Sequence, residues 1–461
     1  MPHAPLAQAL AGFAAGLALE GVPASTRERA KLLVLDALGV ALASASFEFG
    51  RRAVEGLSAL ESGNAPVIGF SARLAVRDAI LANGILTHGI DYDDTSIAAR
   101  IHPGSVCMPV AMTLGTHLGR TGAEILVAYI AGMESAMRVG AVAPGRAKER
   151  GFYPTGVVGT FGAALIAGRL LGLDQAQLAA AQGIAYSTAS GNQAFTAEMA
   201  WTKRMHPGWA GVGGVTAALL AKGGYVGPSE PYEGKFGFYR VYAGADADAD
   251  NLARASADLG TRWEIDQVSV KPLPACYFSI AAIDAAAGLA REHGLEASGI
   301  EKVRVLLPAA AVETVCEPSR VRRRPADPYA AIFSIYYGVA VALARRKYTL
   351  ADLEPAALED PEVLALAQRV EYEIDPKTTF PRYYSGGVVV VTRDGRTLER
   401  REDVHRGAAE RPLLWEEIVR KFTSNATRVL DAARAERVCE AVLGLERVTD
   451  TQALAPLLAP A

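Results

Sequence analysis

Apolar residues recur at helical spacing through the first 265 positions of this 461-residue chain, in segments rich in alanine and glycine. Such periodicity predicts helices, and small residues let helices pack closely. These positions are therefore expected to form a dense all-helical domain. The helical runs predicted here are 73–88, 105–118, 122–140, 156–171, 174–189 and 207–222, with an earlier helix that starts after a Ser25/Thr26 cap.

The pattern changes near residue 265. Residues 302–308 and 370–375 have strand-like composition, and a hairpin is expected at 386–402 about an Asp394-Gly395 turn. A helix at about 327–345 lies among these strands, and helical periodicity returns after about 410. The simplest architecture is mostly α, with a helical domain built from 1–265 and 408–461 and a smaller α/β lid domain inserted at 266–407. A cleft between two such domains is a common place for a small-molecule site.

Composition narrows the classes of partner. The net charge of −3 gives no reason to expect nucleic acid or a membrane surface as partner. The four cysteines are far apart and form no C-x-x-C motif, which fits a reducing cytoplasm and argues against a structural zinc site. The apolar N-terminal segment lacks a basic region and fits an amphipathic helix better than a signal peptide. No uninterrupted apolar run reaches about 18 residues, so no transmembrane span is expected.

The stretch HGIDYDDTSIAARIHPGS, residues 88–105, places three aspartates and two histidines directly after an apolar run. Aspartate is unfavourable at a helix C-terminus, where the helix dipole is already negative, so these residues need another purpose. Capping of the next segment is an alternative for Asp93 and Asp94. Asp91 follows His88 by three residues and is expected to orient His102, which lies in a Pro-Gly turn and is the candidate for proton transfer.

Cationic residues in two further stretches suggest an anionic substrate. Lys203, Arg204 and His206 precede a glycine-rich helix, where an anion is favoured, and the alternative is a solvated basic turn. Trp201, Met205 and Trp209 interleave with these charges and are expected to bury the segment. Lys271, held before Pro272 where the helical and inserted regions meet, is a candidate for binding a substrate carboxylate.

Two tyrosines complete the set. Tyr153 precedes the Gly- and Thr-rich start of a helix, and Tyr337 lies on an apolar helix from which its phenol can point at a cleft, although packing also explains it. The sequence contains no nucleophile elbow, P-loop or convincing G-x-G-x-x-G motif. Cations, an Asp/His pair and a phenol suit proton abstraction next to a carboxylate, with lysines stabilising the enediolate-like charge.

These stretches together resemble the 2-methylcitrate dehydratase and cis-aconitate decarboxylase family, also called MmgE/PrpD, which includes an iminodisuccinate epimerase. The resemblance runs nearly end to end and rests on an ordered set of motifs. In chain order the motifs are ANGILTHGIDYDDT…HPGS, GVVGTFGAA, KRMHPGWAGVGGVTAALLAKGGYVGP, YEGKFGF and KPLPAC…IDAA.

The resemblance implies a helical large domain, an α/β lid, a homodimer, and chemistry on small di- or tricarboxylates that needs neither metal nor cofactor. By motif, Asp91 and Thr95 match the acid-and-threonine segment and His102 the general acid/base. Lys203 and Lys271 match the substrate-carboxylate lysines, and Tyr337 matches a tyrosine of the lid. The substrate-binding candidates are Thr95, Lys271, Arg204, His206 and Asp94, and the catalytic candidates are His102, Asp91, Lys203, Tyr153 and Tyr337.

The chain also departs from the family pattern. Many relatives have a histidine where Tyr153 stands, and one or two more near the positions of Tyr277 and Ile280. A phenol, with a pKa near 10, is a much weaker acid at neutral pH than imidazole, with a pKa of about 6.5. A lyase, either a dehydratase or a decarboxylase, is therefore weighed against an epimerase or isomerase that uses His102 with Lys203 or Tyr153.

Two more distant alternatives remain. DYDDT matches the D-x-D-x-T motif of magnesium-dependent phosphatases, which requires a buried strand before the first aspartate. The missing histidines also suggest a catalytically silent family member, although Asp91, His102, Lys203 and Lys271 are all retained.

Overall fold

The computed structural model describes residues 4–60, 62–245 and 247–460 and divides the chain into two compact units. The first unit comprises the residues up to Gly89, Asp93–Val268, and those from Leu414 onward. The second unit comprises Ile90–Tyr92 and Ser269–Leu413. The expectation of a mostly α fold is confirmed.

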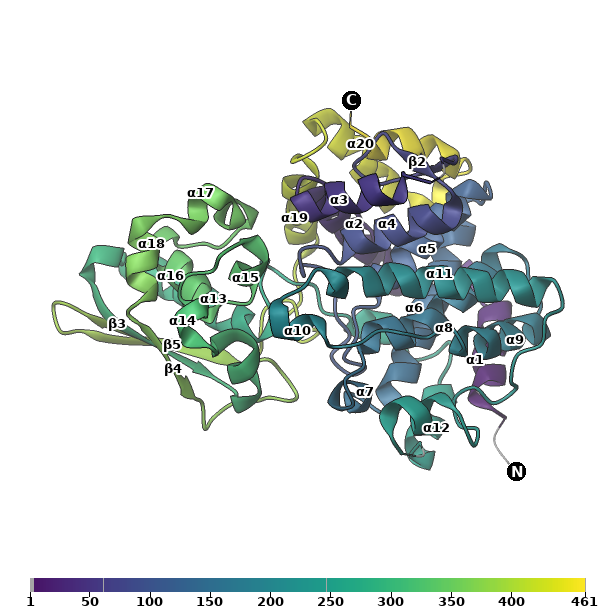
Figure 1. Cartoon of the computed structure of the whole chain (residues 1–461), viewed down its shortest axis with the longest axis horizontal. Coiled ribbons are helices and arrows are strands. Elements are labelled where there is room, and N and C mark those ends of the chain that lie inside the picture. The colour runs from purple at the N-terminus through teal and green to yellow at the C-terminus, as the bar shows by residue number, and fades with distance from the viewer. Residues whose placement is uncertain (1–3, 61, 246, 461) are drawn as a thin grey trace. The chain divides into compact units, whose positions relative to one another are not determined.

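Helices dominate the secondary structure of the first unit, and the predicted helical runs are all present (Figure 1). A two-stranded antiparallel hairpin, β1 (Ala65–Pro66) with β2 (Arg73–Leu74), accompanies them. The helices are α1 (Leu6–Gly16), α2 (Ala24–Ala45), α3 (Glu48–Leu57), α4 (Val76–Thr87), α5 (Gly104–His117), α6 (Gly122–Val142), α7 (Arg146–Glu149), α8 (Pro154–Leu170), α9 (Gln175–Tyr186), α10 (Phe195–Glu198), α11 (Thr202–Lys222), α12 (Ala249–Ser256), α19 (Trp415–Ala426) and α20 (Ala432–Leu443).

Small residues bring these helices into close contact, as their composition predicts. A methyl group on Gly84 of α4 would lie 2.3 Å from the Cα atom of Gly208 on α11, so only glycine fits at this crossing. The crossing places the C-terminal end of α4 beside the N-terminal half of α11. These two helix ends carry the loop that starts at His88 and the cations that follow Trp201.

The start of α2 corrects one prediction. The helix begins at Ala24 after Pro23, without a side-chain cap, rather than after a Ser25/Thr26 cap. The Thr26 side chain lies inside the first turn, and its hydroxyl donates a hydrogen bond to the Asp266 carboxylate at 3.0 Å. Thr26 therefore stabilises a contact with a distant segment, which the local cap pattern does not reveal.

Helix α19, from the C-terminal part of the chain, packs against α2. The buried Lys421 Nζ and Asp36 Oδ1 atoms lie 2.7 Å apart, forming an ion pair between the two helices. A methyl group on Gly39 would lie 3.1 Å from the Cα atom of Phe422, so α19 approaches the α2 backbone closely. The last helices are thus part of the same core as the first ones.

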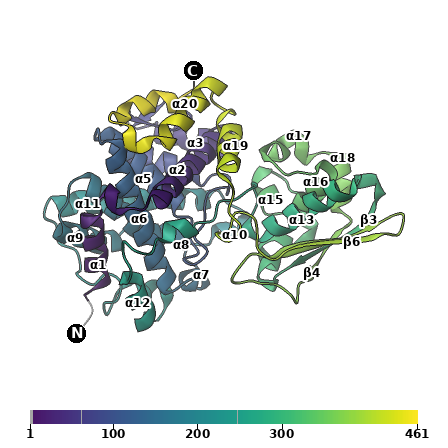
Figure 2. The ribbon, with the colours of Figure 1, turned by 180° about the vertical axis from the view of Figure 1, so that it is seen from behind.

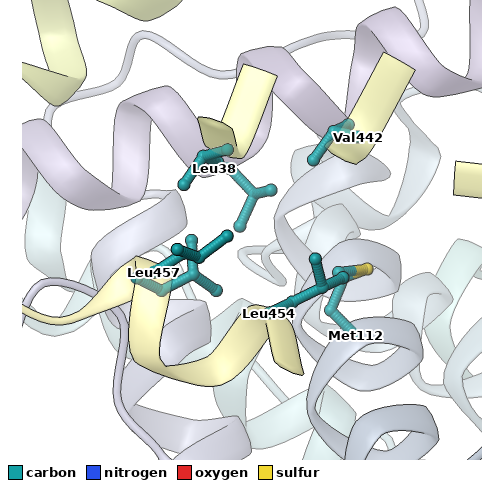
Figure 3. Close-up of a pocket in the computed structure, with 7 residues that line it drawn as sticks. Leu38, Met112, Val442, Leu454 and Leu457 are labelled. Carbon is teal, nitrogen blue, oxygen red and sulfur yellow. The ribbon is translucent and has the colours of Figure 1, made fainter. Parts of the chain in front are cut away.

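A small cavity near these helices is lined by no polar or titratable side chain. It encloses about 10 Å³, at the lower limit for one water molecule, and its lining is entirely apolar (Figure 3). The lining residues are Leu38, Met112, Val438, Val442, Leu454, Leu457 and Leu458.

Helix α6 is long and apolar enough to cross a membrane, but 94% of its most apolar window is buried inside the protein. Helices α2 and α3 meet the same criteria only when joined across their 88° bend.

The second unit contains a four-stranded sheet in the order β4-β3-β5-β6. Its strands are β3 (Ile300–Leu307), β4 (Val370–Ile374), β5 (Gly386–Thr392) and β6 (Thr397–Glu402). Strands β3 and β4 are parallel, and the other neighbouring pairs are antiparallel. The predicted strands and hairpin are confirmed, and Gly395 has a φ of +87° in the hairpin turn, a conformation that favours glycine.

Helices cover one face of this sheet (Figures 1 and 2). Helix α13 (Tyr277–His293) packs on β5 and β6, and α16 (Ile335–Arg345) packs on α13. The predicted helix at 327–345 is interrupted at Ser334, whose side chain caps α16 by accepting a hydrogen bond from the Tyr337 N–H. The shorter helices of the unit are α14 (Ser319–Arg322), α15 (Pro328–Ile332), α17 (Pro355–Leu358) and α18 (Pro361–Ala367).

Candidate active site

The acidic loop of the first unit starts where α4 ends. His88 is the C-terminal cap residue of α4, and its backbone N–H donates to the Gly84 carbonyl at 3.1 Å. The buried Arg204 guanidinium holds the next residue by donating from Nε to the Gly89 carbonyl at 2.6 Å. The close crossing of α4 and α11 therefore fixes the position of the His88 ring.

His88 joins a carboxylate to a phenol. Its Nδ1 lies 2.7 Å from Asp93 Oδ2, and its Nε2 lies 2.7 Å from the Tyr153 hydroxyl. All three side chains are buried. A carboxylate only accepts hydrogen bonds, so His88 Nδ1 carries a proton in this arrangement. Neither His88 nor Asp93 was singled out for this contact by the sequence pattern.

His102, the main candidate for proton transfer, is held by the same loop. Its Nδ1 lies 2.9 Å from the Asp94 carbonyl oxygen and 3.1 Å from Thr95 Oγ1. Because a carbonyl only accepts, Nδ1 carries the proton and Nε2 is the basic nitrogen of the neutral ring. The side chain is 16% exposed, so it keeps access to solvent. Thr95 and His102, both predicted site residues, therefore lie within hydrogen-bonding distance of each other.

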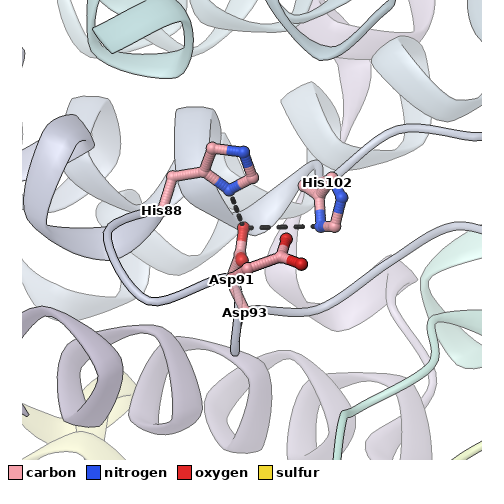
Figure 4. A group of neighbouring side chains, drawn as sticks. All are labelled: His88, Asp91, Asp93 and His102. Carbon is pink, nitrogen blue, oxygen red and sulfur yellow. Dashed lines mark hydrogen bonds and ion pairs between the residues drawn. The ribbon is translucent and has the colours of Figure 1, made fainter. Parts of the chain in front are cut away.

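The carboxylate nearest to His102 Nδ1 in the first unit is that of Asp93, at 3.6 Å (Figure 4). The sequence pattern predicts that Asp91 orients His102, on the premise that Asp91 and His88 share one face of a helix. That premise is wrong, because α4 ends at Thr87 and Asp91 has a left-handed φ of +49°. Within the first unit, the Asp94 carbonyl, the Thr95 hydroxyl and the Asp93 carboxylate all lie near His102 Nδ1.

Asp94 supports the capping alternative. Its Oδ1 accepts a hydrogen bond from the Gly104 N–H, the first residue of α5, at 2.9 Å. Burial, followed by the charge of Asp93, raises the pKa of Asp94 to about 8. Asp94 is therefore largely protonated at neutral pH, and the adjacent acids do not both carry charge.

This shift predicts a pH-dependent stability difference between the wild type and Asp94→Asn. The folded-state pKa is raised, so as pH rises from about 4 to about 8 Asp94 ionises in the unfolded state but stays protonated in the folded state, and the stability of the folded protein falls. Asparagine removes this penalty while keeping the acceptor for Gly104. Urea unfolding should show equal stability of the two proteins near pH 4 and an advantage of Asp94→Asn on the order of a few kcal/mol at pH 8. A constant difference across this range would contradict the assignment.

The basic residues that follow Trp201 are buried, whereas the two tryptophans that flank them are exposed. Lys203, Arg204 and His206 are all buried in the first turns of α11, whereas Trp201 and Trp209 are 45% and 44% exposed. The prediction that the segment is buried is confirmed, but Trp201, Met205 and Trp209 are themselves exposed. The helix turns its basic face toward the core and its apolar residues outward, which excludes the solvated basic turn.

His206 and Arg204 differ from their predicted roles. Burial, followed by the neighbouring His88, lowers the pKa of His206 to about 4, so its ring is neutral at pH 7 and supplies no charge for an anion. Its ring lies 5.5 Å from that of Tyr153. The Arg204 guanidinium lies 4.0 Å above the Phe49 ring and donates to Gly89, which makes it a support for the loop. Lys203 is buried one residue earlier and keeps its predicted role as a proposal.

Asp91 and Lys271 meet within the second unit. Lys271 Nζ lies 3.2 Å from Asp91 Oδ2 and also donates to the Asp91 carbonyl oxygen. The Tyr92 hydroxyl donates to the Pro272 carbonyl at 3.1 Å. The three-residue segment 90–92 is thereby attached to the segment that follows Ser269, and both Asp91 and Lys271 are buried.

The tyrosines of the second unit differ in surroundings. The Tyr337 hydroxyl donates to the carbonyls of Asp352 and Ala357, at 2.6 and 3.1 Å, inside the core. Burial raises the pKa of Tyr337 further above its ordinary value. Packing, the alternative reading, therefore describes Tyr337 better than catalysis. Tyr277 lies with its ring 5.1 Å from Lys271 Nζ, and Ile280 is buried in α13.

Three ligand-type side chains of the first unit gather in one place. The donor atoms of His88, Asp93 and His102 lie within 4.8 Å of one another, and Figure 4 draws them with Asp91 of the same loop. Both ring nitrogens of His88 are already engaged in hydrogen bonds, to Asp93 and Tyr153. Hydrogen bonding within the protein thus accounts for the grouping. The phosphatase alternative fails because helix α4, and not a strand, precedes Asp91.

Comparison with known proteins shows to which family this chain belongs. The MmgE/PrpD N-terminal domain model matches residues 8–249, and the MmgE/PrpD C-terminal domain model matches residues 273–446. A cis-aconitate decarboxylase of Aspergillus terreus is 28% identical over 472 residues, covering 97% of this chain and 94% of that protein. The human cis-aconitate decarboxylase is 29% identical over 448 residues, with 94% and 90% covered. The two family models together span most of the chain, which therefore belongs to the MmgE/PrpD family.

Proposed function

We propose that this protein is a lyase that removes CO₂ or water from a small di- or tricarboxylate of the cis-aconitate or 2-methylcitrate type. The observation that carries the proposal is His102, whose Nδ1–H is anchored on a backbone carbonyl and whose side chain is 16% exposed. The similarity to cis-aconitate decarboxylases over nearly the full chain supports a carboxy-lyase first and a dehydratase second.

The chemistry requires a group that moves a proton at the carbon next to a carboxylate. In decarboxylation, the carbon–carboxylate bond breaks, CO₂ leaves, and the electron pair left on carbon takes up one proton. In dehydration, a base removes a proton from carbon, and the departing hydroxyl takes up a proton and leaves as water. His102 is suited to both reactions because the Asp93 carboxylate, 3.6 Å from its Nδ1, stabilises the imidazolium form.

Buried cations suit the charge of the substrate. Lys203, in the first turn of α11, is a proposed carboxylate ligand, and burial strengthens its attraction for an anion. Lys271 of the second unit is proposed for a second carboxylate, with Asp91 as the residue that positions it. The proposed partners are this small anionic substrate and a second copy of the chain, and the proposed location is the cytoplasm.

The first test is proton NMR of the purified protein in D₂O with citrate, 2-methylcitrate, cis-aconitate or iminodisuccinate. Loss of CO₂ or water from one of these acids supports the lyase and identifies its substrate class. Deuterium incorporation at a carbon next to a carboxylate, without net loss, supports the epimerase or isomerase alternative. No change in any acid would contradict the proposal and favour a catalytically silent protein.

Chelation tests whether the reaction depends on a metal. We expect the turnover rate to stay unchanged after dialysis against EDTA and after addition of Mg²⁺, because hydrogen bonds within the protein engage both nitrogens of His88. The measurement is the initial rate on the substrate found by NMR, with and without each addition. Loss of the rate in EDTA and its return with one divalent metal would instead assign the His88, Asp93 and His102 group to metal binding.

A further inference from the structure

We propose that Tyr153 is a second proton-transfer residue and that His88 and Asp93 are positioning residues that control its proton. The inference rests on the proposed lyase function and deepens it. It concerns the position where this chain has a phenol instead of the histidine expected from the family resemblance. A phenol alone, with a pKa near 10, exchanges protons poorly at neutral pH. The buried histidine behind it changes that situation.

The three groups form one continuous hydrogen-bonded chain, Tyr153–His88–Asp93, with both contacts at 2.7 Å. Asp93 and His88 are almost fully buried, so water does not compete for these hydrogen bonds. The Tyr153 backbone is also fixed, because its N–H donates to the Gly191 carbonyl at 3.0 Å and Tyr153 precedes Pro154, the first residue of α8. The Phe195 ring packs edge-on against the Tyr153 ring at 5.5 Å.

The charge of His88 sets the direction in which Tyr153 moves a proton. When His88 is neutral, with its proton on Nδ1, Nε2 accepts from the phenol, and the phenol oxygen can accept a proton from substrate. When His88 is an imidazolium, Nε2–H donates to the phenol oxygen, and the phenol O–H can donate to substrate. Asp93 stabilises the imidazolium, as the acid does in a nucleophile–histidine–acid triad.

Each direction conserves protons and charge. In donation, the substrate carbanion takes the phenol proton, the His88 Nε2 proton moves to the phenol oxygen, and neutral His88 remains. In abstraction, the substrate proton moves to the phenol oxygen as the phenol proton moves to His88 Nε2, leaving an imidazolium and a carbanion. The donating direction completes a decarboxylation, and solvent returns the proton to His88 after product release.

The groups around His88 are few and defined. Asp93 and Tyr153 contact its two nitrogens, and the His102 ring lies 4.8 Å away. On helix α11, His206 is close enough that burial and then the neighbouring His88 lower its pKa, and Arg204 donates to Gly89, the residue after His88. Asp91 and Asp94 lie on the same loop. The Asp93 carboxylate contacts His88 Nδ1 directly, at 2.7 Å.

Kinetics of Tyr153→Phe, His88→Asn and the double variant test the inference. We expect Tyr153→Phe to lower kcat by about 10²- to 10³-fold and His88→Asn by at least about 10-fold. If His88 acts only through Tyr153, the double variant should be no slower than Tyr153→Phe. The pH profile of kcat should differ between the wild type and His88→Asn, because the variant cannot take up or release the relayed proton. Matched controls are Tyr186→Phe, whose hydroxyl donates to the Phe236 carbonyl, and the exposed His117→Asn, both with wild-type kcat.

Multiplicative effects of the two substitutions, or a wild-type pH profile in His88→Asn, would overturn the relay while leaving the lyase intact. A readout without turnover keeps the two proposals separate. In ¹⁵N-histidine-labelled wild type, the His88 Nε2 resonance should shift on Tyr153→Phe, and the Nδ1–H proton should appear at low field. A wild type that lacks lyase activity but shows both signals would refute the function alone. Absence of the Nε2 shift would refute the relay.

Discussion

Replacement of His102 by glutamine is expected to lower kcat on the substrate found by NMR by about 10²- to 10⁴-fold, the range typical of a lost general acid or base. Glutamine keeps a side-chain N–H that can donate to the Asp94 carbonyl, but it has no basic nitrogen that titrates near neutrality. The loop should therefore keep its conformation. The measurement is steady-state kinetics of wild type and His102→Gln under identical conditions.

Thermal unfolding provides the control for this variant. His102 is held by the Asp94 carbonyl and Thr95, and its backbone N–H donates to Thr155 Oγ1 at 3.1 Å, so most local contacts survive the substitution. The Tm should change little while kcat falls. The exposed His117→Gln on α5 should change neither quantity. Wild-type turnover by His102→Gln would remove His102 from the mechanism.

Replacement of Lys421 by methionine is expected to destabilise the folded protein by about 3–5 kcal/mol at neutral pH, the range for an ion pair broken in a core. The substitution leaves the Asp36 carboxylate buried without the lysine 2.7 Å away. Burial raises the pKa of Asp36, and Lys421 lowers it, so without the lysine the folded-state pKa rises further. Urea unfolding at pH 7 measures the loss directly.

The size of this effect depends on pH. A raised folded-state pKa costs stability only above the unfolded-state pKa, so the loss in Lys421→Met should shrink as pH falls toward 4. Arg420→Met, one residue away and exposed on the same helix, is the matched control and should change stability by less than about 0.5 kcal/mol. An equal loss in both variants, or a loss that grows toward pH 4, would contradict the account.

Most of the fold follows from patterns of short range. Alanine and glycine at helical spacing predict the helices of the first unit, because a close crossing such as Gly84 with Gly208 tolerates only small residues. Polarity alternation and the Asp394-Gly395 turn predict the hairpin, since both features are local. The start of α2 could not be predicted in this way. The Thr26 hydroxyl donates to the Asp266 carboxylate, and this contact joins residues far apart in sequence.

The site was predictable in its location and only partly in its contacts. His102 and its loop were found because two histidines and three aspartates after an apolar run are costly unless they have a purpose. The pairing within the loop was not found, because spacing of three assumes a helix that in fact ends at Thr87. The chain then turns, and Asp93 faces His88. The contact of His88 with Tyr153 joins two segments 65 residues apart and has no sequence signal.

The contact between α2 and α19 also constrains how the chain is made. Asp36 leaves the ribosome several hundred residues before Lys421, a delay of roughly twenty seconds to more than a minute at about 5–20 residues per second. During synthesis the face of α2 that α19 covers has no partner, and the whole second unit emerges in between. The second unit is contiguous apart from three residues, so it can fold first. The face of α2 that α19 covers therefore stays without this partner until α19 has emerged.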